Sequence, residues 1–207
     1  MARCVYMLTI VALSLLLAGC TARATTTREA PTGRIVHHMH ERAADRPIGA
    51  PEVGKAMVVF LRPSTESGTA SPVYELRSGE DTFIGFVPPR SKLTYVTRSG
   101  KTRFMVVSEA ADFMEAELEA GKTYYTLVTE RRGYWKPGFS LSPVKAAAFE
   151  TAEVTDCLNK CRLVENSDAS HAWAKRNLPS IQKRKANSLG EWEARTDRPS
   201  LGISDGR

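Results

Sequence analysis

Short runs of hydrophobic residues, either continuous or alternating with polar ones, fill the middle of this 207-residue chain. They lie between Lys55 and about Val144, recur roughly every ten positions and are separated by Gly, Pro and Ser. No long helical pattern interrupts them, so they predict an antiparallel β-sandwich and not a parallel α/β sheet. The predicted strands are residues 55–61, 72–77, 81–87, 92–98, 101–107, 112–118, 122–131 and 138–144.

Two local patterns add detail to this sandwich. The pair Ser99-Gly100 separates two alternating runs, which predicts a β-hairpin. In residues 112–118, Glu115 and Glu117 alternate with hydrophobic positions, which predicts that one face is buried and that the acids face solvent. Paired acids also serve glycoside hydrolases, but alternation is the ordinary pattern of a half-buried strand.

After Lys145 the pattern becomes helical. Residues 146–165 carry hydrophobic side chains at helix-like steps, and Asn166-Ser167-Asp168 offers a cap for a second helix. Pro179 fits the first turn of a third helix. Trp173 and Trp192 are expected to pack this segment onto the sheet, and the alternative is that exposed rings stack on sugars.

The predicted boundaries follow from these patterns. The β-sandwich domain spans residues 54–145, and the helical extension spans 146–197. The last ten residues, 198–207, show no period and are expected to be a disordered tail. The predicted fold is mainly β: an antiparallel immunoglobulin-like or prealbumin-like β-sandwich with a helical C-terminal extension.

The N-terminus carries an apolar run, Val5 to Leu17, whose thirteen residues are too few to span a bilayer. It ends in Leu17-Ala18-Gly19-Cys20, which resembles the signal of bacterial lipoproteins. The resemblance implies that residues 1–19 are removed and that Cys20 carries acyl chains such as palmitate. Two or more chains anchor a protein stably to a bilayer. No Asp follows Cys20, which favours the outer membrane, facing the periplasm.

Residues 20–53 are polar and Thr-rich and are expected to be a flexible tether. Three of the four histidines of the chain, His37, His38 and His40, lie in this segment. A metal-ligand cluster is one interpretation of them, and a polar linker is the other. Because a mobile segment must be ordered before it holds an ion, we expect no metal site here.

The remaining cysteines, Cys157 and Cys161, are four residues apart. In an oxidising compartment a disulfide is the default expectation. Residues one helical turn apart lie near the upper limit of disulfide spacing, so a bridge fits better if the helix frays or turns at Asn159. Two alternatives stay open, a redox-active thiol pair and a zinc site that includes His171.

The charge balance is mildly basic, with a formal net charge of +6. This favours an anionic envelope surface as partner over nucleic acid, although a solvated basic surface without a partner gives the same balance. The densest basic run, Lys183-Arg184-Lys185, fits either a solvated helix face or a contact with anionic lipid or cell wall.

Catalytic signatures are missing from the sequence. It contains no Gly-x-Ser-x-Gly elbow, no P-loop and no dinucleotide fingerprint, and His171 is the only histidine outside the tether. We therefore expect no enzyme activity and no cofactor.

Arg62 ends an apolar run and is expected to pair with an acid of the neighbouring sheet; a carboxylate or phosphate ligand is the alternative. Tyr124 and Tyr125 should point to opposite faces of one strand, which leaves one of them for a ligand.

Three segments resemble a known family. They are "GKAMVVFLRPS" at residues 54–64, "FIGFVPPRSKLTYVTRSGKTRFMVV" at 83–107, and "LEAGKTYYTLV" at 118–128. Together they are similar to a family of bacterial lipoproteins, the domain of unknown function numbered twenty-eight forty-six. The family usually has Gly where this chain has Arg90, and Gly normally supplies the positive φ of a tight turn. The resemblance implies a small β-sandwich on a lipid anchor and assigns no catalytic residues.

The sequence thus predicts a non-catalytic lipoprotein of the cell envelope, a structural or protein-interaction module that Cys20 tethers to the membrane. Its partner is expected to be an envelope protein or the cell wall. The alternative is a small-ligand or glycan-binding module of the periplasm.

Overall fold

The computed structural model describes residues 39–41, 48–66, 68–131 and 138–207. Its strands are β1 Met39–Glu41, β2 Lys55–Arg62, β3 Ser71–Arg77, β4 Glu80–Val87, β5 Ser91–Arg98, β6 Gly100–Val107, β7 Ala111–Leu118, β8 Thr123–Arg131, β9 Gly138–Pro143, β10 Arg162–Asn166 and β11 Ser200–Leu201. Its helices are the 3-10 turns η1 Ala146–Ala148 and η2 Ile203–Asp205 and the α-helices α1 Ala152–Lys160 and α2 Asp168–Glu193.

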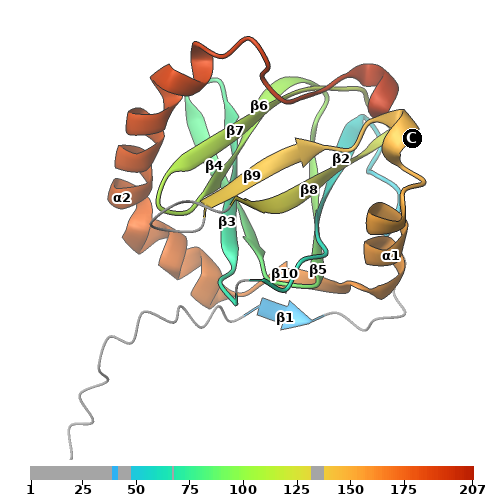
Figure 1. The fold of residues 1–207 in the computed structure, drawn as a ribbon, viewed down its shortest axis with the longest axis horizontal. Coiled ribbons are helices and arrows are strands. Elements are labelled where there is room, and N and C mark those ends of the chain that lie inside the picture. The colour runs from blue at the N-terminus through green and yellow to red at the C-terminus, as the bar shows by residue number, and fades with distance from the viewer. Residues whose placement is uncertain (1–38, 42–47, 67, 132–137) are drawn as a thin grey trace, which may run out of the picture. The chain divides into compact units, whose positions relative to one another are not determined.

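The strands form two sheets (Figure 1). Sheet A has the order β1-β10-β5-β2-β8-β9, and sheet B has the order β11-β7-β6-β3-β4. The predicted mainly β fold is confirmed, but the sheets are mixed and not purely antiparallel. Three pairs run parallel: β10 with β5, β2 with β8, and β11 with β7. The partners of each pair are distant in sequence, so no hairpin turn forces them to run antiparallel.

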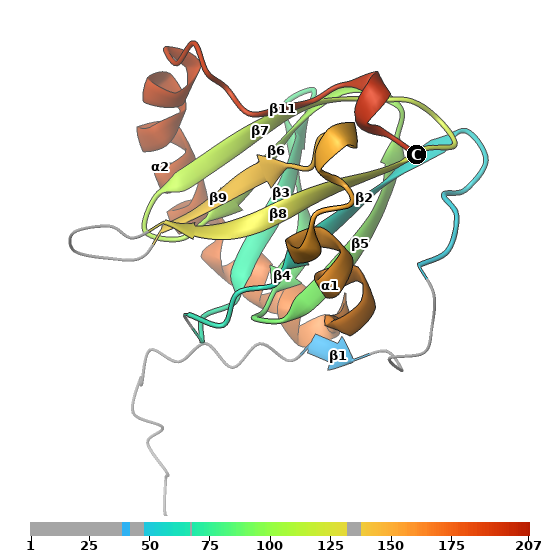
Figure 2. The same ribbon diagram turned by 45° about the vertical axis from the view of Figure 1, so that its right-hand side comes forward.

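Both sheets are covered on both faces. The central core lies between the sheets and contains Phe60, Phe104 and Tyr124. A second cluster joins the outer face of sheet A to α1, and a third joins the outer face of sheet B to α2. Figure 2 shows α1 and α2 on different sides of the strands. This explains the unbroken apolar run of β2, which is buried along almost its whole length, because a strand covered on both faces has no solvent side.

The predicted hairpin at Ser99-Gly100 is wrong. Strand β5 belongs to sheet A and β6 to sheet B, so this short connection passes between the sheets. Gly100 has a φ of +99°, a conformation that side-chain-bearing residues rarely adopt. The Arg77 side chain donates hydrogen bonds to the carbonyl oxygens of Arg98 (2.8 Å) and Ser99 (3.2 Å). The backbone groups of this bend are thus satisfied by a side chain and not by a hairpin partner.

The turn before β5 forms without glycine. Arg90 stands where the resembling family usually has Gly, and it adopts a φ of +52°. Its place in the turn is fixed by neighbours on both sides: Arg162 donates its backbone N–H to the Arg90 carbonyl (3.0 Å), and Ser91 donates its hydroxyl to the carbonyl of Pro88 (2.6 Å).

The predicted helix over residues 146–165 is shorter than expected. Only η1 and α1 form, and the following residues make strand β10, which adds to sheet A beside β5. Leu163 and Val164 are both buried there, which a helix-like spacing of apolar residues did not reveal. The two helices expected around Pro179 are one continuous helix, α2, with Pro179 inside it and exposed. The Ser167 hydroxyl caps α2 as expected, accepting from the Ser170 N–H (3.4 Å).

The predicted disordered tail is also wrong. Residues Ser200–Leu201 form β11, which pairs with β7, and Leu201 is buried in the central core. Arg207 exchanges two backbone hydrogen bonds with Thr123 at the start of β8 (2.7 and 3.0 Å). The tail therefore crosses from sheet B to sheet A, as Figure 2 shows. Its order comes from one buried side chain and edge hydrogen bonds, which leave no periodic pattern in the sequence.

Candidate functional site

Several predicted features lie outside the described residues. The signal peptide 1–19, Cys20, His37 and His38 are among them. His40 belongs to β1, of which only the backbone is described. This strand lies within the predicted tether of residues 20–53, and it pairs antiparallel with β10.

Arg62 lies at the end of β2, fully buried between the sheets. Its guanidinium forms an ion pair with Glu130 of β8 (2.6 Å) and donates to the carbonyl oxygens of Val87 (2.9 Å) and Thr69. It also lies 4.6 Å from the centre of the Phe139 ring. The acid comes from the adjacent strand of the same sheet, not from the neighbouring sheet as predicted.

These contacts give Arg62 a structural role. Burial lowers the pKa of its guanidinium, and the hydrogen bond and charge of Glu130 oppose that shift. The donors of Arg62 reach the backbone carbonyls of Thr69, in the segment after β2, and of Val87, the last residue of β4. Because Arg62 has no exposed surface, a phosphate or carboxylate ligand does not reach it in this conformation.

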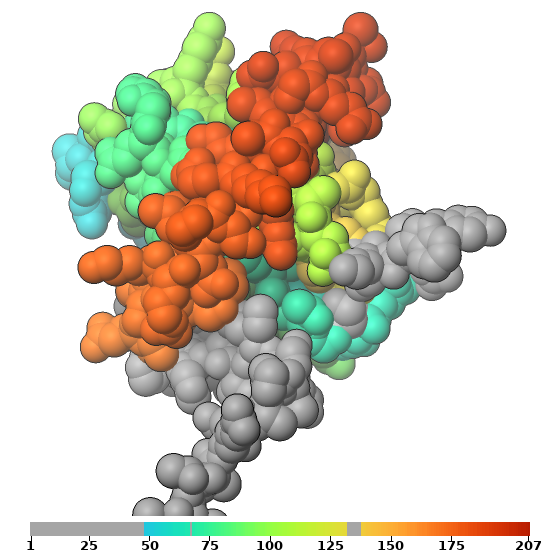
Figure 3. Space-filling model, turned by 90° about the vertical axis from the view of Figure 1, so that its left-hand side faces the viewer, coloured from blue at the N-terminus to red at the C-terminus, as the bar shows by residue number. Residues whose placement is uncertain are grey.

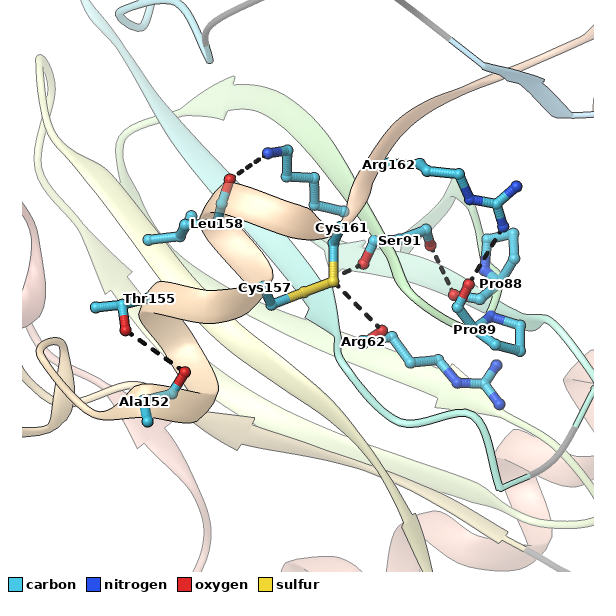
Figure 4. The surroundings of a disulfide bond; sticks show 11 residues. Arg62, Pro88, Pro89, Ser91, Ala152, Thr155, Cys157, Leu158, Cys161 and Arg162 are labelled. Atoms are coloured by element: carbon cyan, nitrogen blue, oxygen red, sulfur yellow. Dashed lines mark hydrogen bonds between the residues drawn. A yellow bond between two sulfur atoms is a disulfide. The ribbon is translucent and has the colours of Figure 1, made fainter. Parts of the chain in front are cut away.

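Cys157 and Cys161 are joined by a disulfide, with their Cα atoms 4.7 Å apart (Figure 4). Helix α1 ends at Lys160, and Cys161 already has extended backbone angles, so the bridge forms where the helix stops. The Sγ of Cys157 lies 3.9 Å from the carbonyl oxygen of Ser91, and the Sγ of Cys161 lies 3.9 Å from that of Arg62. The sulfur atoms thus pack against backbone carbonyl oxygens at the start of β5 and the end of β2, and because they are bonded to each other neither is available to a zinc ion.

A buried lysine makes a second contact between α1 and sheet A. Lys92 of β5 is 8% exposed, and its ammonium group donates to the carbonyl oxygen of Leu158 near the end of α1. Burial lowers the pKa of this ammonium group. A cation near the C-terminal end of a helix also interacts favourably with the helix dipole.

The two tyrosines of β8 face opposite sides, as predicted. Tyr124 is fully buried in the central core, and its hydroxyl accepts from the Glu119 N–H (2.8 Å). Tyr125 lies on the outer face of sheet A, half-buried, with its ring centre 4.9 Å from that of Phe149. Burial raises the pKa of Tyr125, and the charge of Arg207 opposes this. The structure does not bring Arg62, Tyr124 and Tyr125 together into one site.

A buried carboxylate that the sequence analysis missed lies between the sheets. Glu75 of β3 is 5% exposed and accepts hydrogen bonds from Tyr95 (2.8 Å), Thr97 (2.9 Å) and Thr102 (2.9 Å). Arg77 forms an ion pair with the same carboxylate (3.0 Å). The signal was present in the sequence, because Glu75 occupies the same face of the strand as the core residue two positions before it.

A second missed carboxylate holds the C-terminal tail. Asp205 is 8% exposed and accepts from the Gly202 N–H (2.7 Å) and from the Lys145 ammonium group (3.0 Å). Burial alone would raise the pKa of Asp205, but these hydrogen bonds and the charge of Lys145 outweigh it, so the pKa is lowered. Beyond it, Gly206 packs so closely on Tyr124 that an added Cβ would lie 2.6 Å from the ring.

The tryptophans of α2 and two of the three cations of its basic run face sheet B. Trp192 contacts Phe113 (5.5 Å between ring centres), and Trp173 contacts Phe86 (4.8 Å), which confirms their predicted packing role. In the basic run, Arg184 donates to the carbonyl of Ser108 and Lys185 pairs with Asp81 (2.7 Å), while Lys183 is exposed. Two of the three cations thus bind the sheet.

Three hollows mark the described surface. One, of about 650 Å³, lies over the ends of β6, β7 and β11, where two cations of β6 lie opposite two acids of β7: Lys101, Arg103, Glu115 and Glu117. Another, of about 350 Å³, lies beside the disulfide. The third, of about 270 Å³, is bordered by three aromatic side chains and one cation: Phe86, Phe139, Trp173 and Arg184.

The described ranges, 39–41, 48–66, 68–131 and 138–207, contain neither a metal-type cluster nor a membrane-spanning helix. Nowhere in them do three or more His, Cys, Asp or Glu gather as they would around a metal ion. His171 instead lies against Phe83, with 5.7 Å between the ring centres. None of the helices in these ranges combines the length and hydrophobicity needed to cross a bilayer.

Comparison with known proteins yields no relative: no known protein family matches the chain, and no curated protein does.

Proposed function

We propose that this chain is a non-catalytic cell-envelope lipoprotein whose β-sandwich serves as a structural or protein-interaction module. Acylated Cys20 would hold it at the outer membrane, facing the periplasm. The observation that carries the proposal is the open edge of sheet A: β9 is the last strand, and no described strand pairs with its outer side. An unpaired strand edge is a template for adding a strand from a partner.

Two residues that the sequence predicted as possible ligand contacts, Arg62 and Tyr124, support an interaction module over a ligand site. Arg62 binds Glu130 and two backbone carbonyls, and Tyr124 lies in the core. Their hydrogen-bonding capacity is directed inward, to the fold. A partner would therefore be recognised by the backbone of an edge strand and by surface side chains.

The anchor has a direct test. In the Cys20→Ser variant the signal peptide has to be cleaved by another route. Once it is cleaved, the variant should be found in the soluble fraction and not in the membrane fraction. Mass spectrometry of the mature wild-type N-terminus should show acyl chains on Cys20. A wild-type protein without acyl chains contradicts the anchor.

The interaction edge is tested separately in cells. A photoreactive amino acid at Ser140 or Ser142, both half-buried on β9, should give a covalent adduct with one recurring envelope protein. The same photoreactive residue at Lys101, exposed on β6, is the matched control and should not. Identical adduct patterns from β9 and β6 would reject the edge as the binding surface.

A second candidate function, glycan binding, is favoured by one observation. The hollow of about 270 Å³ is bordered by the half-buried Trp173 and by the cation Arg184. Aromatic faces in a concave site suit sugar rings. Calorimetric titration with soluble cell-wall fragments tests this candidate. Heat that disappears in the Trp173→Ala variant but persists in Lys160→Gln would favour it, and no heat from the wild-type protein excludes it.

The finer fold assignment, immunoglobulin-like or prealbumin-like, also belongs to this proposal. Its support is the face-to-face packing of β2 to β9 around one core.

A further inference from the structure

Helix α2 has an unusual charge distribution. Residues 169–190 contain five Lys or Arg and no Asp or Glu, and the acids of the helix lie in its first and last turns. Arg184 and Lys185 contact sheet B. The other three cations, Lys175, Arg176 and Lys183, are exposed and form no ion pair among the described residues.

These three cations share the face of α2 that points away from the sheet. At 3.6 residues per turn, Lys175, Arg176 and Lys183 lie within about 100° of one another. The buried side of the helix is opposite and carries Ala174, Ile181 and Trp192. The positions between the cations are small or compact and exposed: Ala172, Pro179, Ala186 and Gly190. The result is a basic face without bulky side chains at its centre.

This basic face occupies one side of the molecule. In Figure 3, α2 runs as an orange ridge across the surface that faces the viewer. Such a ridge presents its cations to a flat surface at the same time. A flat anionic surface satisfies all three charges without a shaped pocket.

The entry of the N-terminal segment lies next to this helix. In β1, Met39 pairs with Asn166 of β10, and Asn166 directly precedes the cap of α2, Ser167. Eighteen residues separate Met39 from Cys20, and even fully extended this segment reaches about 65 Å at most. A bilayer that holds Cys20 is therefore within reach of the first turns of α2.

We propose that the basic face of α2, formed by Lys175, Arg176 and Lys183, lies on the anionic head groups of the bilayer that holds the lipid anchor. This inference rests on the proposed lipoprotein function. Phosphate-bearing head groups supply the negative charge, and an arginine makes paired hydrogen bonds to phosphate oxygens. Each cation near such a surface favours the docked state by about fivefold, so three favour it on the order of a hundredfold.

The test uses the acylated full chain in vesicles. The protein is reconstituted into vesicles of phosphatidylcholine alone or of an equimolar mixture with phosphatidylglycerol. Brief acetylation followed by mass spectrometry then gives the labelling rate of each lysine. Lys175 and Lys183 should label several-fold more slowly on the anionic vesicles, and high salt should restore their rates, because salt screens exposed charges. Lys160 on α1 should label equally on both.

A matched pair of variants isolates the basic face. In one, Lys175, Arg176 and Lys183 become Gln; in the other, the exposed Arg98, Lys101 and Lys160 become Gln, which removes the same charge elsewhere. Hydrogen exchange of the α2 backbone should slow on anionic vesicles in the wild type and in the second variant, but not in the first. Equal effects of the two variants would overturn the inference.

The outcomes of the vesicle experiments distinguish a failure of this inference from a failure of the proposed lipid anchor. If the protein floats with neutral vesicles but its α2 lysines are labelled at equal rates on both kinds of vesicle, the lipid anchor is supported and docking of the basic face is refuted. If the protein floats only with anionic vesicles, the lipid anchor is refuted and docking of the basic face is supported. An α2 whose lysines are protected on both kinds of vesicle alike also refutes the inference, since its protection does not depend on anionic lipid.

Discussion

The buried carboxylate of Glu75 offers the sharpest test of the sandwich interior. It accepts three hydroxyl hydrogen bonds, two from sheet A residues Tyr95 and Thr97 and one from Thr102 of sheet B. Replacing Glu75 by Gln keeps the shape but removes the negative charge. A hydrogen bond to a charged group contributes about 1 kcal/mol more than one to a neutral group. Three such bonds, with the ion pair to Arg77 lost, predict a destabilisation of about 3 kcal/mol.

Urea denaturation followed by tryptophan fluorescence measures this loss. The matched control is Glu117→Gln, exposed on β7, which should change the free energy of unfolding by less than about 0.5 kcal/mol. Thr97→Val should cost about 2 kcal/mol in the wild type and clearly less in the Glu75→Gln background, because the hydroxyl has then already lost its charged acceptor. A Glu75→Gln variant within about 1 kcal/mol of wild type, or equal costs of Thr97→Val in both backgrounds, would refute the reasoning.

Three further predictions concern other buried groups. Replacing Glu130 by Gln leaves the buried Arg62 without its counter-charge and should cost about 3 kcal/mol in urea denaturation; a cost below about 1 kcal/mol would contradict the importance of this pair. Replacing Cys157 and Cys161 together by Ala opens a five-residue loop and should cost about 2 kcal/mol, with reduction of the wild type giving the same loss; alkylation of both thiols in the unreduced protein would contradict the bridge. The lowered pKa of Asp205 stabilises the fold above its unfolded pKa of about 4, and this contribution is lost as the pH falls through the folded pKa. Replacing Asp205 by Asn should therefore cost about 1–2 kcal/mol at pH 7 and flatten the stability profile in acid; an unchanged acid profile would show that another group controls it.

The strands were predictable because their hydrophobic runs are long and their turn residues are clear. Strand β2, for example, extends only one residue beyond the predicted 55–61. The pairing of the strands was not predictable in the same way. The short connection at Ser99 resembles a hairpin turn, but Thr97 and Thr102 on its two sides both bond Glu75, and this three-way contact places the two strands in different sheets. Such a contact depends on tertiary structure and leaves no local pattern.

Among the candidate site residues too, local features were predictable from the sequence and long-range contacts were not. That Tyr124 and Tyr125 point to opposite faces follows from the period of a strand, and the sequence predicted it. Which acid reaches Arg62 depends on β2 and β8 being neighbours, a long-range pairing that one sequence does not reveal. The ordered tail was missed because single contacts, such as those of Leu201 and Asp205, hold it in place. These few contacts produce no periodic signal.

The two buried charge clusters also constrain how the sheets pair. Glu75 and the pair of Arg62 with Glu130 all point between the sheets. A one-residue slip of β3 would turn Glu75 outward beneath the apolar side of α2 and would move the buried Tyr74 from there to the space between the sheets. An unpaired carboxylate against an apolar helix face is strongly unfavourable, so the alternative register is penalised. We infer that these polar groups specify register as much as they add stability.

Covering both sheets restricts where a partner binds. Helix α1 lies on the outer face of sheet A and α2 on that of sheet B, so neither face is open in the way a two-layer sandwich would leave it. The surfaces that remain include the edge strand β9 and the outward side of α2. The edge belongs to sheet A, whereas α2 covers sheet B, so docking α2 on a bilayer leaves the edge of β9 unoccupied. A lipid-anchored protein arranged in this way would lie against the membrane through its helix and offer a strand edge to a second envelope component.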